Sequence, residues 1–231
     1  MKKVLITGGT SGIGYATLKE LVDKYQVIFT YHHNEEKALE IINKYHIKGY
    51  YLDLGNKESI EKLVDSIDNI DILINNAAIC SDNSFEDKTY MEFSKVVNVN
   101  LTGTYYLTKL LSKKINNGGN VLFISSTNGI DTYYIESIDY DASKAGVISL
   151  MHNFAKELAP IRVNAIAPGW VDTEMNASLS DKFKKKEEEH ILLKRFASPE
   201  EISKVINFVI SDDASYINDT VIRVDGGVNN G

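Results

Sequence analysis

Two side chains that could move a proton stand four residues apart in Tyr140-Asp141-Ala142-Ser143-Lys144, directly before an apolar helical pattern from Ala145 to Leu158. Residues four apart share one face of a helix, so Tyr140 and Lys144 would project together. A lysine ammonium close to a phenol favours the phenolate and lowers its pKa from about 10. The pair therefore predicts a tyrosine that acts as an acid or base near neutral pH, although this spacing also occurs by chance in many helices.

A glycine-rich turn lies near the start of the chain, where the apolar run Val4–Thr7 leads into Gly8-Gly9-Thr10-Ser11-Gly12-Ile13-Gly14 and then into a helical pattern. Glycine lets the backbone turn sharply and come close to a pyrophosphate, and the N-terminus of the following helix offers free N–H groups. Three residues separate Gly8 from Gly12, which differs from the usual G-x-G-x-x-G spacing. A turn of this kind between a strand and a helix predicts a dinucleotide site rather than only a tight loop.

Short apolar runs alternate with longer helical patterns along almost the whole chain. The expected strands are Val4–Thr7, Val27–Tyr31, Gly49–Asp53, Ile72–Asn75, Val121–Ser125, Arg162–Ala167 and Val221–Val224. Nearly continuous apolar strands that alternate with helices indicate an α/β fold, a doubly wound parallel sheet of about seven strands with helices on both faces. No linker rich in Pro, Gly or Ser divides residues 1–231, so we expect a single domain.

The composition excludes several classes of protein. The 25 Lys and Arg residues stand against 32 Asp and Glu, which argues against a chain built to hold nucleic acid. Cys80 is the only cysteine, so the sequence has no disulfide framework and no cysteine-rich zinc site. No run reaches the roughly 20 apolar residues that span a bilayer, and the N-terminal apolar run is too short for a signal peptide. We therefore expect a cytoplasmic protein that binds neither nucleic acid nor a membrane.

Together these features resemble the short-chain dehydrogenase/reductase (SDR) family, whose domain is of the Rossmann type, and the resemblance covers nearly the whole chain. Further segments match the family in order, and any one of them is weak alone. They are Asp53-Leu54, Asn75-Asn76-Ala77-Ala78, Asn98-Val99-Asn100-Leu101, Ile124-Ser125-Ser126 with Gly129, Arg162 to Gly169 with Thr173, and Val224-Asp225-Gly226-Gly227. Ala78 stands where the family usually has glycine.

The resemblance implies an NAD(P)-dependent oxidoreductase that interconverts a carbonyl and a secondary alcohol by hydride transfer. Tyr140 would be the acid or base, Lys144 would lower the phenol pKa, Ser126 would stabilise the developing oxyanion, and Asn100 would hold a water. Because the interval from Ser126 to Tyr140 is one residue longer than usual, Thr127 is the alternative hydroxyl. The implied cofactor contacts are Gly8, Thr10, Ser11, Gly12, Ile13, Gly14, Tyr31, His32, Asp53, Leu54, Asn76, Ala77, Tyr140, Lys144, Pro168, Gly169, Val171 and Thr173.

The end of the second expected strand favours NADP(H) over NAD(H). An acidic residue there would bind the ribose 2′-hydroxyl and repel a 2′-phosphate, but Tyr31 stands at this position and His32-His33-Asn34 follow. These polar donors could hold a phosphate. Neither Arg nor Lys is present, so the selectivity would be modest, and weaker above pH ~6.5 if it depends on charged histidine. The adjacent histidines have no evident third ligand, and we expect no metal site.

The substrate remains open between two classes. The segment Ile79–Asn83 is similar to 3-oxoacyl-[acyl-carrier-protein] reductases, which implies a carrier-protein thioester as substrate. Asn176 stands where an arginine is common in those enzymes, however, and only Lys113 and Lys114 offer a basic patch. A small-molecule carbonyl or alcohol is therefore the alternative, as in a sugar, polyol or small-ketone dehydrogenase. A non-catalytic dinucleotide-binding regulator fits less well, because it would be expected to lose Tyr140, Lys144 or Ser126.

Two expectations concern larger parts of the chain. Residues 177–193 follow the nicotinamide-contacting Thr173 and include the charged run Lys182–Glu189, which predicts an exposed helix and a mobile lid over the substrate. The family resemblance implies a homotetramer. The apolar side chains from Leu101 to Leu111 spread around more of a helix than one sheet face would cover, which favours the same interpretation.

Overall fold

The computed structural model describes residues 1–228 and confirms the α/β class. Seven strands form one sheet in the order β3-β2-β1-β4-β5-β6-β7, and every neighbouring pair is parallel. The strands are β1 (Lys3–Ile6), β2 (Gln26–Tyr31), β3 (Lys48–Tyr51), β4 (Ile70–Asn75), β5 (Ile115–Ile124), β6 (Arg162–Pro168) and β7 (Val221–Val224). Each expected strand is present: β7 has the expected bounds, β5 begins six residues earlier than expected, and the remaining ends differ by at most two residues.

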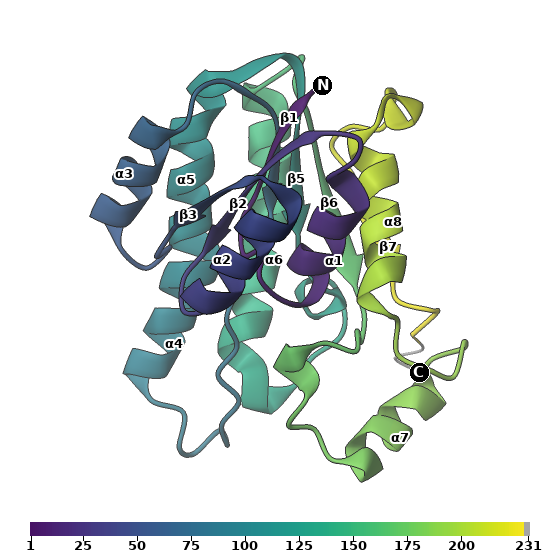
Figure 1. The fold of residues 1–231 in the computed structure, drawn as a ribbon. Coiled ribbons are helices and arrows are strands. Elements are labelled where there is room, and N and C mark those ends of the chain that lie inside the picture. Colours follow the sequence, from purple (N-terminus) through teal and green to yellow (C-terminus); the bar gives the residue numbers. More distant parts are fainter. Residues whose placement is uncertain (229–231) are drawn as a thin grey trace.

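The helices cover both faces of the sheet, as expected (Figure 1). They are α1 (Gly12–Leu21), α2 (Glu35–Tyr45), α3 (Lys57–Ser66), α4 (Tyr90–Val97), α5 (Thr104–Leu111), α6 (Ile138–Glu157), α7 (Asp181–His190) and α8 (Pro199–Ile210). Side chains of α1, α2 and α8 pack on one face, and those of α3, α5 and α6 pack on the other. Within residues 1–228, no helix is both long and apolar enough to span a bilayer.

The alternation of side chains in β1 explains how one strand serves both layers. Val4, Leu5 and Ile6 are all fully buried, but Val4 and Ile6 join the cluster beneath α1, whereas Leu5 joins the cluster beneath α5. Successive residues of a strand point to opposite faces, so a strand covered on both sides must be apolar at every position. This is the physical reason for the continuous apolar runs in the sequence.

Helix α6 begins at Ile138, ahead of the apolar pattern that starts at Ala145. Its first turns contain the buried polar residues Asp139, Asp141 and Lys144 instead of apolar ones. Tyr140 and Lys144 consequently lie four apart on one helix, as the spacing predicted. The apolar pattern understates the helix because the first turns face a polar site and not the core.

The carboxyl ends of the parallel strands meet at one edge of the sheet, and β1 and β4 mark the point where the strand order reverses direction. Connections leave these two strands toward opposite faces, which opens a crevice between them. The Thr7 hydroxyl joins the segments that follow β1 and β4. Its oxygen accepts hydrogen bonds from the backbone N–H groups of Asn76 (2.9 Å) and Ala77 (3.0 Å). The two segments that bound the crevice are therefore fixed to each other.

Candidate active site

A cavity of about 850 Å³ opens at this edge of the sheet. Every residue that the sequence analysis named as a cofactor contact lines it, from Gly8 in the glycine-rich turn to Thr173 after β6. Tyr140, Lys144 and Ser126 line the same cavity. Segments that are far apart in the sequence thus converge on one space with the proton-transfer residues on its wall.

The glycine-rich turn has a geometry that only glycine satisfies. Gly8 and Gly12 have φ values of +70° and +49°, and a Cβ on Gly14 would lie 2.1 Å from the carbonyl oxygen of Gly8. The Asn76 carboxamide holds the turn by donating to the carbonyl oxygens of Thr7 (2.9 Å) and Gly8 (3.2 Å). Ser11, at the N-cap of α1, makes no side-chain hydrogen bond to the helix. The start of α1 therefore faces the cavity as a site that fits a diphosphate.

Tyr140, Ser126 and Lys144 form the polar wall of the cavity. The Ser126 hydroxyl donates to the Asn128 carboxamide oxygen at 3.1 Å and lies close enough to the Tyr140 phenol to lower its pKa. The Lys144 ammonium lies 5.3 Å from the centre of the Tyr140 ring and donates to the carbonyl oxygen of Ile124 at 2.8 Å. Two hydroxyl groups and one ammonium therefore lie on the lining of one cavity, where a substrate could reach them.

The electrostatics of Tyr140 differ from the sequence-based expectation. Burial, followed by the nearby Cys80, raises the pKa of the phenol above its ordinary value, and the nearby Ser126 hydroxyl opposes this only in part. Burial also lowers the pKa of Lys144 to about 8. The expected lowering of the Tyr140 pKa is thus wrong for this structure, because desolvation disfavours the charged forms of both groups. The phenol keeps its proton at neutral pH and is prepared to act as an acid.

The structure distinguishes between the two candidate hydroxyl groups. Ser126 lines the cavity and contacts Tyr140, whereas Thr127 is buried and is not among the lining residues. Ser126 also accepts a hydrogen bond from the backbone N–H of Asn128 at 3.2 Å. Of the two, Ser126 is the hydroxyl that a substrate in the cavity could reach.

Asn100 is placed differently from what the sequence suggested. Its carboxamide accepts from the backbone N–H of Ile79 and donates to the Ile79 carbonyl, both at 2.8 Å, and it also donates to the Ser143 hydroxyl at 3.1 Å. Asn100 is buried and does not line the cavity. These contacts fix the segment after β4 to α6, so Asn100 positions the cavity wall, and its water-holding role stays a prediction.

The end of β2 lines the cavity with aromatic and imidazole groups and carries no acid. The imidazole of His32 lies 3.7 Å from the Asp53 carboxylate, measured from Nε2 to Oδ2. Its ring centre is 3.9 Å from that of His33. His33 and Asn34 line the cavity as well as the expected Tyr31 and His32.

Glu174 is a contact that the sequence analysis missed. Its carboxylate oxygen Oε2 accepts the backbone N–H of Gly12, the first residue of α1, at 2.9 Å. Only its position directly after Thr173 could have indicated a place near the cavity. A carboxylate here occupies the positive end of the helix dipole, which is where a diphosphate would bind.

Helix α7 also differs from the exposed charged helix that the sequence predicts. Most of its residues are exposed, but Glu187 is buried and accepts hydrogen bonds from the Tyr134 hydroxyl and from Trp170 Nε1, the latter at 3.2 Å. Trp170 is enclosed by three further aromatic rings, those of Tyr134, Phe183 and Phe196. The helix is thus fastened to the rest of the molecule by one carboxylate and an aromatic cluster.

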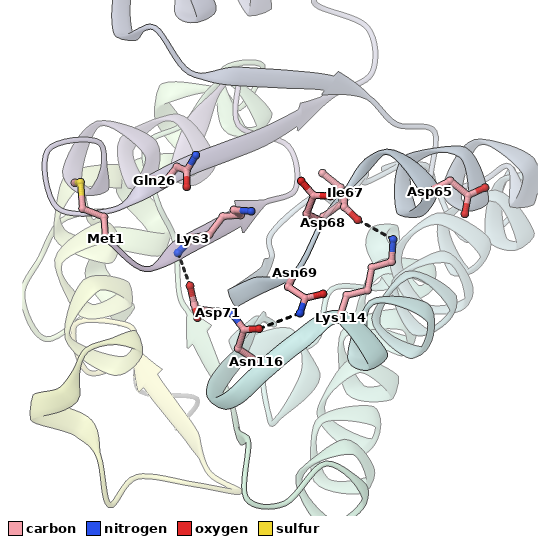
Figure 2. A pocket seen from close by; sticks show the side chains of 10 residues that line it. All are labelled: Met1, Lys3, Gln26, Asp65, Ile67, Asp68, Asn69, Asp71, Lys114 and Asn116. Carbon is pink, nitrogen blue, oxygen red and sulfur yellow. Dashed lines mark hydrogen bonds between the residues drawn. The ribbon is translucent and has the colours of Figure 1, made fainter.

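A second cavity, of about 560 Å³, lies at the opposite edge of the sheet and contains none of the expected site residues (Figure 2). Two of its charged side chains form hydrogen bonds with the backbone. The Lys114 ammonium donates to the carbonyl oxygens of Val64 and Ile67, both at 2.7 Å, and Asp71 accepts the backbone N–H of Lys3 at 2.6 Å. Its polar side chains hold the loops at this edge together. Within residues 1–228, no group of three or more His, Cys, Asp or Glu side chains could hold a metal.

Comparisons with known proteins agree with this geometry. A family model described as "Enoyl-(Acyl carrier protein) reductase" matches residues 8–229. The chain is 40% identical to the 3-oxoacyl-[acyl-carrier-protein] reductase FabG of Aquifex aeolicus, over 98% of this chain and 97% of the relative. The chain belongs to the short-chain dehydrogenase/reductase family. It is therefore an NAD(P)-dependent oxidoreductase that acts on a carbonyl or an alcohol.

Other SDR relatives show how widely the similarity extends. A tropinone reductase homolog of Arabidopsis thaliana is 36% identical over 98% of this chain and 91% of its own length. A short-chain dehydrogenase from Burkholderia cenocepacia, solved in complex with NADP, has a TM-score of 0.92 and 26% identity, with 98% of this chain and 97% of that chain covered. The glycine cradle before α1 fits the dinucleotide that this family uses.

We expect that Glu174→Gln strengthens dinucleotide binding. A diphosphate needs the N–H groups at the start of α1, and the Glu174 carboxylate both competes for the Gly12 N–H and repels the phosphates. Removing the charge should lower the dissociation constant by about two- to fivefold. Fluorescence titration or calorimetry with the oxidised and reduced dinucleotides measures this.

Glu200→Gln is the matched control. Glu200 pairs with Lys19 on α1 at 2.9 Å, outside the lining of the cavity, so its neutralisation should leave the dissociation constant unchanged. Unchanged or weaker binding in Glu174→Gln would show that the carboxylate does not oppose the dinucleotide.

Proposed function

We propose that this SDR enzyme reduces 3-oxoacyl thioesters carried by acyl carrier protein, with NADPH as the hydride donor. The observation that carries this proposal is the placement of Tyr140, Ser126 and Lys144 on the lining of one cavity that also contains the glycine cradle. The 3-oxoacyl-[acyl-carrier-protein] reductase relatives, which align with almost the whole chain, support the choice of substrate class.

Each polar residue of the cavity wall would have its own role in the reduction of a ketone. Bound NADPH supplies the hydride to the carbonyl carbon. Ser126 would donate a hydrogen bond to the oxygen as it gains negative charge, and Tyr140, protonated because burial raises its pKa, would transfer its proton to that oxygen. The Lys144 ammonium, close to the Tyr140 ring, would stabilise the phenolate that remains.

The family model's description raises the alternative of enoyl reduction, in which a carbon–carbon double bond takes up the hydride. The polar wall favours the carbonyl reaction, because a ketone that becomes an alcohol needs a proton on its oxygen, where Tyr140 and Ser126 meet. A small ketone is the second candidate substrate, and similarity to the tropinone reductase homolog favours it.

We expect that the enzyme oxidises NADPH with an acetoacetyl thioester and not with a crotonyl thioester. Tyr140→Phe removes the proton donor but keeps the ring, so turnover should fall by about 100-fold or more while dinucleotide binding is retained. Tyr133→Phe is the control, since Tyr133 is exposed and bonds only its own turn through the Ile130 carbonyl.

Three results would contradict the proposal in different ways. Turnover of the crotonyl thioester alone would identify an enoyl reductase. Turnover of small diketones but not of thioesters would favour the small-ketone function. Near-normal turnover in Tyr140→Phe would exclude Tyr140 as the proton donor with any substrate.

We further propose a preference for NADPH over NADH. Support comes from the absence of an acid at the end of β2 and from the imidazoles of His32 and His33 on the cavity wall. The ratio of kcat/KM for NADPH to that for NADH should exceed one. His32→Gln should lower the ratio at pH 6. A tenfold preference for NADH in the native enzyme would overturn this proposal.

Residues 177–193 are proposed to act as a lid over the substrate. In support, α7 lies away from the sheet (Figure 1), and Glu187 is its only buried residue. We expect amide hydrogen exchange in α7 to be faster than in β1 and β4 and to slow when NADP⁺ and a 3-hydroxyacyl thioester bind together. Exchange as slow as in those strands, and unaffected by ligands, would contradict the lid.

We also propose a cytoplasmic homotetramer, on the basis of family resemblance. The apolar residues of α5 support assembly less than the sequence suggested, because Leu107 and Leu111 are buried in the core and Tyr106 and Leu110 pack against it. Tyr105 remains 38% exposed, beside Phe154 of α6, and offers an apolar contact to another subunit. Light scattering gives the number of subunits.

A further inference from the structure

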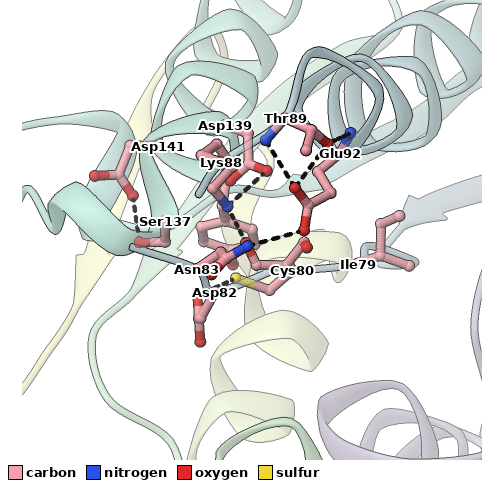
Figure 3. A network of polar contacts seen from close by, with 12 residues as sticks. Ile79, Cys80, Asp82, Asn83, Lys88, Thr89, Glu92, Ser137, Asp139 and Asp141 are labelled. Carbon is pink, nitrogen blue, oxygen red and sulfur yellow. Dashed lines mark hydrogen bonds and ion pairs between the residues drawn. The ribbon is translucent and has the colours of Figure 1, made fainter. Parts of the chain in front are cut away.

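An ion pair outside the expected site residues is formed by Lys88 and Asp139 (Figure 3), and Asp139 directly precedes Tyr140 in the chain. The ammonium of Lys88, from the segment between β4 and α4, is 3.1 Å from the carboxylate of Asp139, in the first turn of α6. The side chains are 5% and 0% exposed, so this pair is withdrawn from water. The other ion pairs described in the molecule have at least one side chain that is more than a quarter exposed.

Both partners of this pair also hold the backbone around the cavity. The Lys88 ammonium donates to the carbonyl oxygen of Ser81, in the segment that follows β4. The other carboxylate oxygen of Asp139 accepts the backbone N–H of Tyr140 at 2.9 Å. Lys88 and Asp139 therefore connect the segment after β4 to the residue that carries the phenol.

The electrostatic influence of the pair reaches the Cys80 thiol. Asp139 raises the pKa of the Cys80 thiol and Lys88 lowers it, although burial is the larger cause of its raised value. Cys80 in turn lies close enough to Tyr140 to raise the pKa of the phenol. Because the Asp139 carboxylate bonds the backbone N–H of Tyr140 at 2.9 Å, a charge left alone at the pair would also lie directly beside Tyr140.

Several acidic groups surround Tyr140, so the neutralisation of Asp139 by Lys88 affects the net charge around the phenol. Cys80 and Asp82 come from the segment after β4, and Asp141 and Lys144 come from α6. Glu92 of α4 lies farther out, where it accepts a hydrogen bond from Asn83 at 3.3 Å. Lys144 is the one cation among them, and Asp139 without Lys88 would add a further negative charge next to the phenol.

We propose that Lys88 is a positioning residue for the reaction, which cancels the charge of Asp139 and fixes the segment after β4 against α6 so that Tyr140 can exchange its proton. This inference rests on the proposed acid and base role of Tyr140. It gives Lys88 and Asp139 opposite effects on the phenol, which a purely structural ion pair would not have.

The test is the pH dependence of kcat/KM for oxidation of a 3-hydroxybutyryl thioester by NADP⁺, a direction in which Tyr140 must be ionised. Lys88→Met leaves the Asp139 carboxylate alone, so the midpoint of the rise should move to higher pH by about half a unit or more. Asp139→Asn leaves the ammonium alone, and the midpoint should move to lower pH. The double variant removes both charges and should return to the native midpoint.

Lys88→Arg is the conservative control and should keep the native midpoint, since it retains the charge. Difference absorbance at the tyrosinate band, taken between each protein and its Tyr140→Phe counterpart, gives the phenol titration without turnover. Should Lys88→Met fail to fold, Asp139→Asn still tests the shift of the midpoint to lower pH. The double variant still tests the return to the native midpoint. Native midpoints in every variant, or shifts of the same sign in both single variants, would overturn the inference.

Different results would contradict the role of Tyr140 and the role of Lys88. If Tyr140 is not the acid and base, Tyr140→Phe retains turnover and the absorbance titration has no counterpart in the rate profile. If only the inference about Lys88 is wrong, Tyr140→Phe is inactive but the midpoints do not move apart.

Discussion

Asp139, Asp141 and Lys144 are buried in the first two turns of α6, with Tyr140 between them. Removing charged groups from water costs several kcal/mol for each ion unless partners replace the water. Lys88 forms an ion pair with Asp139, and the Asn128 carboxamide and the Tyr134 N–H donate hydrogen bonds to Asp141. The Ile124 carbonyl accepts a hydrogen bond from Lys144. All four partners lie outside α6, so the start of this helix depends on the end of β5 and on the segments that follow β4 and β5.

The parallel sheet makes that convergence possible. Because all seven strands point the same way, the segments that leave their carboxyl ends lie along one edge. Thr7 joins the ends of β1 and β4, and the Asn76 carboxamide closes the glycine-rich turn over the same point. The cradle for the dinucleotide and the acid/base wall therefore share a rigid support, although α1 and α6 pack on opposite faces of the sheet.

The sequence was informative where a pattern has one physical cause. Strands buried on both faces must be apolar at each position, as β1 is, and Gly8 and Gly14 could be read as a cradle because no other residue fits there. It was uninformative where charged residues meet across long separations. Lys88 and Asp139 are 51 positions apart, and Tyr134 and Glu187 are 53 apart. Single charged residues in polar segments are ordinarily exposed, so their burial has no local signal.

The same burial that demands these partners also gives the site a chemical direction. Desolvation raises the pKa of Tyr140 and lowers that of Lys144 to about 8, so at neutral pH the phenol holds its proton while most Lys144 side chains stay charged. Reduction of a carbonyl starts from this protonation state, whereas oxidation of an alcohol must first remove the phenolic proton. Each uncompensated anion near Tyr140 would make that removal harder and its return easier. The balance between Asp139, Asp141 and their partners thus sets how readily one tyrosine can serve both directions of the reaction.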